Sequence, residues 1–185
     1  MHTKNEKITL PEGIFNAELQ IFDESDRDFL RSLYNKWNEL SKLLEDNGGR
    51  RLNIPELISE AIFCIEFNAA RVTKSIGGAN SSFDCFNLKN NKRIQVKACS
   101  VNADLTSFGP TSVWDEIYFV HMLPINNYDG SYNIYKIDNA SIYNHKVNKK
   151  QTMKEQQLLG KRPRFSILQS LIQPNDLQPL ISKKL

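Results

Sequence analysis

The feature that most restricts how this chain can fold is a pair of strand-like runs joined by a turn-like Asn90-Asn91. Residues 83–87 read FDCFN before the turn, and residues 93–99 read RIQVKAC after it. Aromatic and β-branched side chains on both sides of a polar pair are typical of an antiparallel β-hairpin. We therefore expect a hairpin in the middle of the chain, with a lysine inside its second strand.

The strand period of two decides which side chains of the second run share a face. The polar set consists of Arg93, Gln95, Lys97 and Cys99. The alternate set, which we expect to face the core, consists of Ile94, Val96 and Ala98. Asp84, on the first arm, comes close to Gln95 if the two arms pair suitably.

Two helices are predicted before the hairpin. Apolar residues recur at helical spacing from about Ser25 to Gly48-Gly49, and again from Ile54-Pro55 to about Ala69. Ser25 followed by Asp28 resembles a capping box at the start of the first helix. Pro55 suits the first turn of the second helix.

Strands are predicted after the hairpin over residues 116–122 and 132–137. Asp138 suits the N-cap of a short helix, residues 151–158 have a helical pattern, and the tail from Pro174 is expected to be irregular. The order of two helices, mixed strands and short helices predicts a single α/β (α+β) domain, with a mixed β-sheet flanked by helices.

The 185 residues are expected to form one domain in three parts. These are an N-terminal helical part (about 13–75), a catalytic sheet (about 80–140) and a basic C-terminal part (about 141–185).

Charge is unevenly distributed along the chain. Residues 1–90 hold 11 basic and 14 acidic side chains, whereas residues 91–185 hold 13 basic and 7 acidic ones. Within residues 145–164, seven basic side chains accompany one acid, Glu155. This basic half favours a polyanionic partner such as nucleic acid, and the alternative is a solvated lysine-rich surface.

Several classes of protein are not expected. Three cysteines without a C-x-x-C pair argue against a disulfide framework or a zinc knuckle. The chain has no P-loop, no G-x-S-x-G and no H-E-x-x-H motif, and His121 lies in an apolar run typical of a core histidine. No apolar run reaches the roughly 18 residues of a membrane span, and the N-terminus lacks a secretory pattern. We therefore expect a cytoplasmic, bacterial-type setting without membrane contact.

The hairpin offers an acid, a side-chain oxygen and an amine to one small volume. Asp84 and Gln95 could hold a hard divalent cation, usually Mg²⁺, through oxygen ligands. Such a cation polarises a phosphate and lowers the pKa of a bound water, while Lys97 orients or deprotonates the water or offsets charge on the phosphorane. On this pattern alone, a solvated surface hairpin is an equally good interpretation.

A family resemblance adds to this reading. A helix with an internal Glu, then Asp84, then Gln95-Val96-Lys97 resembles the core of the PD-(D/E)XK nucleases, with Gln in place of the usual acid and Phe83 in place of the usual proline. The segments SSFDCFN, RIQVKA, SFGPTSVWDEIYFV and GKRPRFSI together resemble small type II restriction endonucleases, in particular the group that cuts within GCNGC. The resemblance covers about residues 55–170.

The resemblance implies a restriction-endonuclease-like core and a homodimer that uses Mg²⁺ to cut double-stranded DNA at a palindromic site. It implies a cognate DNA methyltransferase as a genetic partner only. Carried over to this chain, Asp84 is the central metal ligand, Gln95 occupies the second ligand position and Lys97 is the catalytic lysine. The helix acids that could complete the site are, in order of preference, Glu60, Glu66 and Glu56. The neutral Gln95 favours one cation over two.

Recognition of a G/C-rich site needs donors for guanine, which arginine supplies in bidentate form. Arg162 and Arg164 flank Pro163, and at least one of them is a candidate to read bases, with phosphate contact only or a solvated basic turn as the alternatives. The other residues expected to bind DNA are Lys146, Lys149, Lys150, Lys154, Lys161, Arg50 and Arg51. The two arginines of that list could instead cap the end of the first helix.

Three rival interpretations remain at this stage. The first is a structure-specific repair or junction nuclease of the same fold. The second is a non-catalytic DNA-binding module, in which Gln95 marks the loss of a metal site. The third is an unrelated α+β protein with a solvated hairpin.

Overall fold

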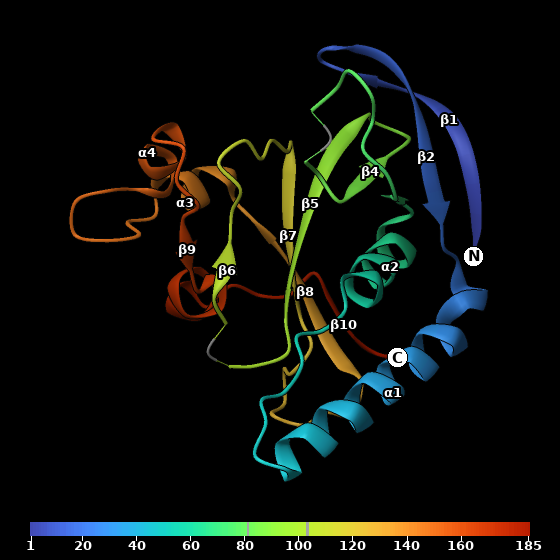
Figure 1. Ribbon diagram of the computed structural model, residues 1–185, viewed down its shortest axis with the longest axis vertical. Coiled ribbons are helices and arrows are strands. Elements are labelled where there is room, and N and C mark those ends of the chain that lie inside the picture. Colours follow the sequence, from blue (N-terminus) through green and yellow to red (C-terminus); the bar gives the residue numbers. More distant parts are fainter. Residues whose placement is uncertain (81, 103) are drawn as a thin grey trace.

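A mixed β-sheet runs through the middle of the molecule (Figure 1). The computed structural model describes residues 1–80, 82–102 and 104–185. Within these ranges the sheet has eight strands in the order β1-β2-β3-β4-β5-β7-β8-β10, and only β5 and β7 pair in parallel. Its strands are β1 (His2–Leu10), β2 (Gly13–Ile21), β3 (Ala70–Val72), β4 (Cys85–Asn87), β5 (Lys92–Cys99), β7 (Glu116–His121), β8 (Ser131–Ile137) and β10 (Ile181–Lys184).

Helical segments cover both faces of this sheet, which confirms the expected α/β class. The helices α1 (Arg27–Asp46) and α2 (Glu56–Phe67) cover one face. The opposite face carries α3 (Asn139–Asn144), α4 (Met153–Leu158), the short pair β6 (Thr106–Ser107) and β9 (Arg164–Phe165), and the turns η2 (Leu168–Ile172) and η3 (Gln173–Asn175). Among the described residues, no helix combines the length and the apolar character needed to cross a lipid bilayer.

Strand β7 shows why the sheet needs cover on both sides. Tyr118 and Val120 pack with α1 and α2, while Ile117 and Phe119 pack into the cluster on the opposite face. A strand that is buried on both faces has a continuous apolar run instead of an alternating one. This accounts for the run that predicted a strand over 116–122, which the structure confirms as β7.

The short helices α3 and α4 begin at side-chain caps that satisfy free N–H groups, whereas α1 and α2 have no side-chain cap. Asp138 Oδ2 accepts the N–H of Ser141 at 2.8 Å, which confirms the N-cap expected at Asp138. The capping box expected at Ser25 is wrong, because Asp23 and Asp26 form the box and cap the short 3-10 turn η1 (Glu24–Asp26) that leads into α1.

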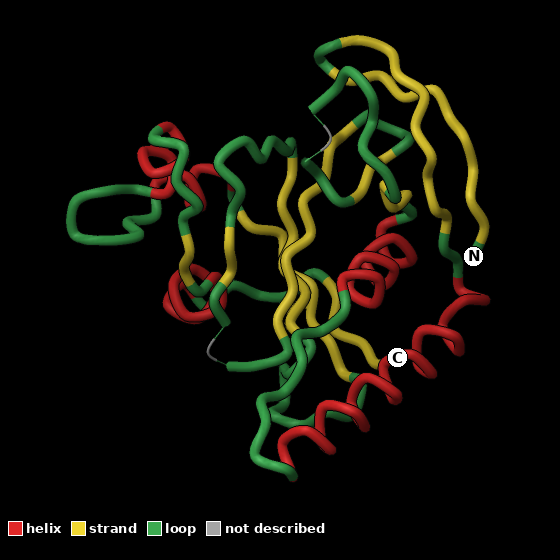
Figure 2. The backbone as a smooth tube through the Cα atoms, viewed as in Figure 1, coloured by secondary structure: helices red, strands yellow, loops and turns green. Residues whose placement is uncertain are grey.

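Four strands of the sheet were not predicted: β1, β2, β3 and β10. The hairpin β1–β2 precedes α1, and the short β3 follows α2, so the part over 13–75 is not wholly helical. The tail expected to be irregular from Pro174 contains β10, which pairs with β8. Figure 2 shows the tail returning to the sheet, and Leu185 joins the core cluster that α1 and α2 cover.

Candidate active site

The predicted hairpin forms, and its arms differ in length. Strand β4 pairs with β5 only over Cys85–Asn87, with Cys85 opposite Ile94. The N–H of Asp84 still donates to Ile94 O at 3.0 Å, after which the arms separate. Asp84 Oδ2 accepts the N–H of Val96 at 2.8 Å and replaces the missing strand partner. The sheet therefore opens beside Asp84, and a buried N–H holds its carboxylate in place.

Gln95 lies opposite Asp84, as the strand period predicted. Its side chain is buried, and Nε2 donates a hydrogen bond to the Asp84 carboxylate. The N–H group, and not the amide oxygen, therefore faces the acid. Because Gln95 does not line the neighbouring cavity, its role as a metal ligand stays a prediction.

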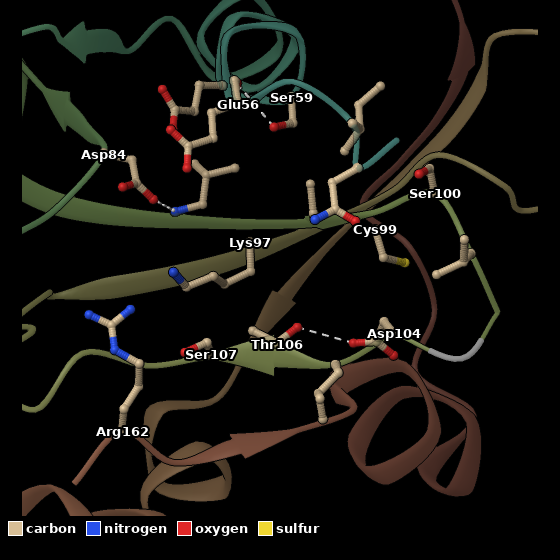
Figure 3. Close-up of a pocket in the computed structure, with 17 residues that line it drawn as sticks. Glu56, Ser59, Asp84, Lys97, Cys99, Ser100, Asp104, Thr106, Ser107 and Arg162 are labelled. Carbon is tan, nitrogen blue, oxygen red and sulfur yellow. Dashed lines mark hydrogen bonds between the residues drawn. The ribbon is translucent and has the colours of Figure 1, made fainter. Parts of the chain in front are cut away.

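A cavity of about 390 Å³ opens between α2, β5 and the β6–β9 pair. Figure 3 shows Glu56 and Ser59 of α2 on one side, Ser107 and Arg162 on the other, and Asp84 and Lys97 near β5. The residues that line it are Asn53, Ile54, Glu56, Ser59, Glu60, Asp84, Val96, Lys97, Ala98, Cys99, Ser100, Val101, Asp104, Leu105, Thr106, Ser107 and Arg162. Residues far apart in the sequence thus share one hollow.

Two acids of this cavity have unusual titration behaviour. Burial raises the pKa of Asp84 to about 6, against the opposing effects of Lys97 and of the hydrogen bond from Val96. Burial and the negative charge of Asp84 raise the pKa of Glu60 to about 7, although Arg71 forms an ion pair with Glu60. The charge of Asp84 therefore makes ionisation of Glu60 harder, and Glu56 has the same effect on Asp84. This is the electrostatic situation that a bound cation relieves.

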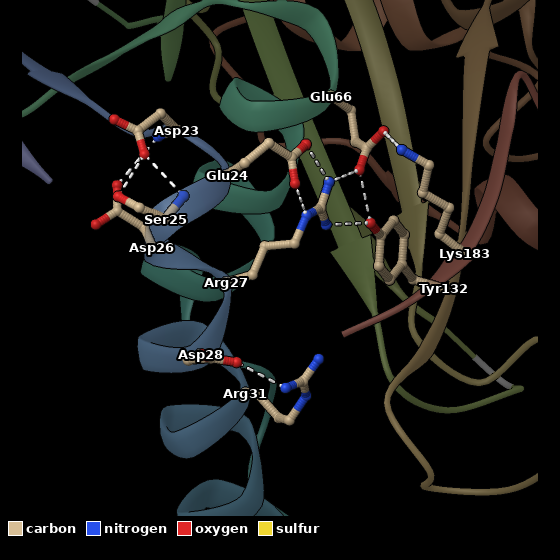
Figure 4. A network of polar contacts seen from close by, with 10 residues as sticks. All are labelled: Asp23, Glu24, Ser25, Asp26, Arg27, Asp28, Arg31, Glu66, Tyr132 and Lys183. Atoms are coloured by element: carbon tan, nitrogen blue, oxygen red, sulfur yellow. Dashed lines mark hydrogen bonds and ion pairs between the residues drawn. The ribbon is translucent and has the colours of Figure 1, made fainter.

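Glu66, the competing helix acid, has other partners. Its carboxylate lies 2.7 Å from Lys183 Nζ and 2.8 Å from the hydroxyl of Tyr132, and it forms an ion pair with Arg27 (Figure 4). Burial alone would raise the pKa of Glu66, but these bonds outweigh it and lower that pKa. Because Glu66 does not line the cavity, the structure favours Glu60 as the helix acid.

The cationic side of the cavity comes from two separate segments. Lys97 extends from β5, with its amine 5.9 Å from the centre of the Phe108 ring. Arg162 reaches the same cavity from the segment before β9. The other basic residue of the Lys97 face, Arg93, instead pairs with Asp115 at 2.9 Å.

The remaining basic residues fall into two groups. The exposed ones surround α4 and β9, on the same side of the sheet as Arg162, and are Lys146, Lys149, Lys150, Lys154, Lys161 and Arg164. Arg50 is exposed after α1, whereas Arg51 is enclosed: its guanidinium lies 3.4 Å from the centre of the Tyr128 ring and 2.6 Å from a Glu45 oxygen. A phosphate contact by Arg51 therefore has no support from its position.

Sequence reasoning missed Asp104, a buried acid of the cavity wall. Its Oδ2 accepts hydrogen bonds from Thr106 Oγ1 and from the N–H of Ile167, both at 3.1 Å, and its other oxygen accepts from Ser166. These bonds tie β6 to the start of η2. Asp104 lies in a polar loop whose pattern predicts no partner, so no sequence signal could have identified this role.

The acid side of the cavity suits Mg²⁺. Within the described ranges, no group of three His, Cys, Asp or Glu residues forms a ready-made ligand set. Mg²⁺ in enzymes that act on phosphates is commonly held by one or two carboxylates, with water and substrate phosphate as the other ligands. Asp84 and Glu60 are the cavity acids that could hold one such ion, and this assignment stays a prediction.

The mixed sheet, with helices on both faces and a hairpin carrying Asp84 and Lys97 beside a helix acid, is consistent with the restriction-endonuclease-like fold class. The chain belongs to the Bsp6I restriction endonuclease family, whose model matches residues 22–174. It is 34% identical over 155 residues to "Type II restriction enzyme Bsp6I" of Bacillus sp. (strain RFL6), a match that covers 82% of this chain and 84% of that protein. No solved structure matches the chain. The restriction endonuclease expected from the sequence is thereby confirmed at the level of the family.

Proposed function

We propose that this protein is a type II restriction endonuclease that uses Mg²⁺ to hydrolyse both strands of DNA at a short, palindromic, G/C-rich site. The cleavage leaves 5′-phosphate ends, and GCNGC is the first site to test. The observation that carries the proposal is the cavity in which Asp84 and Glu60 face Lys97 and Arg162. This cavity combines carboxylates that could bind a cation with side chains that could donate hydrogen bonds to a phosphate. Membership of the family supports the same reaction.

In this reaction a water oxygen forms a bond to phosphorus while the bond from phosphorus to the 3′ oxygen breaks. The attacking water loses a proton to solvent, and the leaving 3′ oxygen gains one. Asp84 and Glu60 would hold Mg²⁺, which would supply Lewis-acid polarisation of the phosphate and of the attacking water. Lys97 donates N–H bonds that orient the water and offset charge on the phosphorane. Gln95 fixes the Asp84 carboxylate through its N–H group.

The protein is proposed to act as a homodimer, because two active sites are needed to cut both strands of a palindrome in one encounter. The exposed lysines around α4 contact phosphates, which position the duplex without reading its sequence. A cognate DNA methyltransferase protects the host's own sites as a genetic partner, and the setting is the bacterial cytoplasm.

The test is digestion of unmethylated plasmid DNA of known sequence in the presence of Mg²⁺, followed by sequencing of the fragment ends. We expect discrete fragments from the wild-type protein and none from Asp84→Ala or Lys97→Ala. Lys92→Ala is the matched control, because Lys92 lies on the same strand outside the cavity and should leave cleavage unchanged.

Each rival predicts a different outcome. Binding without cleavage in Mg²⁺ and Mn²⁺ would identify a non-catalytic DNA-binding module. Cleavage that follows branches or junctions instead of sequence would identify a structure-specific nuclease. Full cleavage by both cavity variants would show that the active site lies elsewhere.

A further inference from the structure

The segment that carries Arg162 is fixed to the wall of the cavity. The N–H of Phe108 donates to Pro163 O at 3.0 Å, and the rings of Phe108 and Phe165 stack with their centres 5.2 Å apart. Directly before this segment, the N–H of Lys161 donates to Gln156 O at 3.0 Å. The backbone on both sides of Arg162 is therefore held at the wall of the cavity.

Acidic side chains lie across the cavity from Arg162. Figure 3 shows Glu56 beside α2 and Asp84 near β5, with Arg162 on the opposite side and Lys97 between them. Asp104 lies on the β6 side, where Thr106, Ser166 and Ile167 already bond to its carboxylate. Arg162 is exposed, and its guanidinium has no hydrogen bond or ion pair among the described residues. An unpaired cation that faces Glu56 and Asp84 across a hollow leaves room for a ligand with one cationic and one anionic partner side.

Ser107 adds a second polar group to the Arg162 wall. Its hydroxyl oxygen is buried and has no hydrogen-bond partner among the described residues, and Ser107 lines the same cavity. Buried hydroxyls are normally paired, so an unpaired one at a ligand cavity indicates a partner that arrives with the ligand. A phosphate oxygen between Ser107 and Arg162 would satisfy both groups.

We infer that Arg162 binds the non-bridging oxygens of the scissile phosphate, opposite the acids, and does not read bases. This inference rests on the proposed function. A guanidinium offers two parallel N–H donors to a phosphate, and its contact strengthens as negative charge accumulates in the transition state. Both arginines are exposed, but Arg164 has a different position: it lies on β9 opposite Ser107 and does not line the cavity. The two arginines that look equivalent in the sequence therefore act differently, and base reading stays with Arg164.

The experiment compares Arg162→Ala, Arg162→Lys and Arg164→Ala in the full-length protein. Single-turnover cleavage is measured on the cognate site and on sites with one changed base pair, and melting temperature checks folding. Removing a donor to a transition-state anion costs about 10²–10³-fold in rate. We expect Arg162→Ala to slow cleavage by roughly 100-fold or more on every site equally. Arg162→Lys, which retains the charge without the paired donors, should stay at least about 10-fold below wild type.

A second measurement keeps the inference testable if a variant is less stable. A neutral methylphosphonate replaces the scissile phosphate, and binding is measured with Ca²⁺. The replacement should weaken binding by the wild-type protein more than binding by Arg162→Ala, because only the wild type loses an Arg162 contact. Equal weakening in both proteins would overturn the inference.

The other outcomes distinguish a wrong role for Arg162 from a wrong proposed function. Cleavage by Arg162→Ala within about threefold of wild type, or wild-type rates in Arg162→Lys, would overturn the assignment of Arg162 alone. A changed ratio between the cleavage rates at cognate and altered sites in Arg162→Ala would also overturn this assignment, because it would show that Arg162 reads bases. A wild-type protein that does not cleave any DNA would overturn the proposed function itself, and this inference with it.

Discussion

Asp84 serves as the strand partner that Val96 lacks, because its Oδ2 lies 2.8 Å from the Val96 nitrogen just before β4 begins at Cys85. The hydrogen-bond pattern of the sheet therefore positions the proposed metal ligand. The same arrangement buries the carboxylate and raises its pKa to about 6. Function and stability thus conflict at Asp84. The negative charge that would bind a cation destabilises the fold when no cation is bound, because the carboxylate is buried.

The conflict predicts that Asp84→Asn and Asp84→Ala differ in stability although both lose cleavage. Asn keeps an oxygen acceptor for the Val96 N–H and carries no charge, so at pH 8 without Mg²⁺ it should be at least as stable as wild type. Ala leaves that N–H unpaired, which costs about 1–3 kcal/mol. Urea unfolding measures the difference, and equal stability of the two variants would contradict the structural role of this bond.

Substitutions of Glu60 and Glu66, which lie on the same helix, should have different effects: the first on activity and the second on stability. Glu60→Gln should abolish cleavage with little loss of stability, because it removes a carboxylate that burial and Asp84 already disfavour. Glu66→Gln should retain the cleavage site but lower stability by roughly 3 kcal/mol, since it removes the buried negative charge that pairs with Arg27 and Lys183. Plasmid digestion and chemical unfolding of both variants test this. Loss of cleavage in a well-folded Glu66→Gln protein would reverse the assignment.

The central part of the site could be predicted from the sequence because it depends on local periodicity. The turn at Asn90-Asn91 and the period of two place Asp84, Gln95 and Lys97 together without knowledge of any distant contact. Local periodicity could not decide whether Glu60 or Glu66 is the helix acid of the site. That choice depends on Lys183, whose strand β10 returns to the sheet from a tail that has no strand pattern.

The position of Arg162 at the cavity could not be predicted from the sequence for a similar reason. Its distance in sequence from Lys97 gives no sign that β9 pairs with β6, a contact of two residues on each side. The hairpin β1–β2 was also missed, because its outward residues are polar and the inward ones, Ile8 and Leu10 among them, form only a short apolar pattern. Long-range pairing decides such elements, and local propensity does not.

Arg50 and Arg51 are adjacent in sequence but have opposite surroundings. Arg51→Ala should lower stability by about 2 kcal/mol, because the guanidinium packs on Tyr128 and bonds to Glu45 in a place where its side chain is 8% exposed. Arg50→Ala is the matched control and should change stability by less than about 0.5 kcal/mol. Thermal unfolding tests the pair, and salt-dependent DNA affinity should not distinguish Arg51→Ala from wild type. A selective loss of DNA binding in Arg51→Ala would restore the phosphate contact expected from the sequence.

His121 should make stability depend on pH. Burial lowers its pKa below the usual 6.5, against the opposing charge of Asp104, and its Nε2 has no partner among the described residues. The unfolded chain therefore binds the proton more readily, so this contribution is present above about pH 6.5 and is lost as pH falls. His121→Gln should lose this dependence, and His2→Gln, at an exposed position, should keep it. Unfolding at about pH 7.5 and pH 5 measures the change. If the free energy of unfolding changed equally with pH in wild type and His121→Gln, the role assigned to His121 would be contradicted.

Gln95 is the residue at which this chain departs from the acid usual in the nucleases that it resembles. Gln95→Glu places a second carboxylate against Asp84 in a buried position, so without a cation it should destabilise the fold by about 1–3 kcal/mol. Added Mg²⁺ should then raise the melting temperature of Gln95→Glu more than that of the wild type, because the new charge gains a counter-ion. Gln173→Glu, at an exposed turn, is the control and should respond to Mg²⁺ as the wild type does. If Mg²⁺ stabilises Gln95→Glu no more than wild type, the cation lies away from Gln95, and Asp84 and Glu60 hold it without this residue.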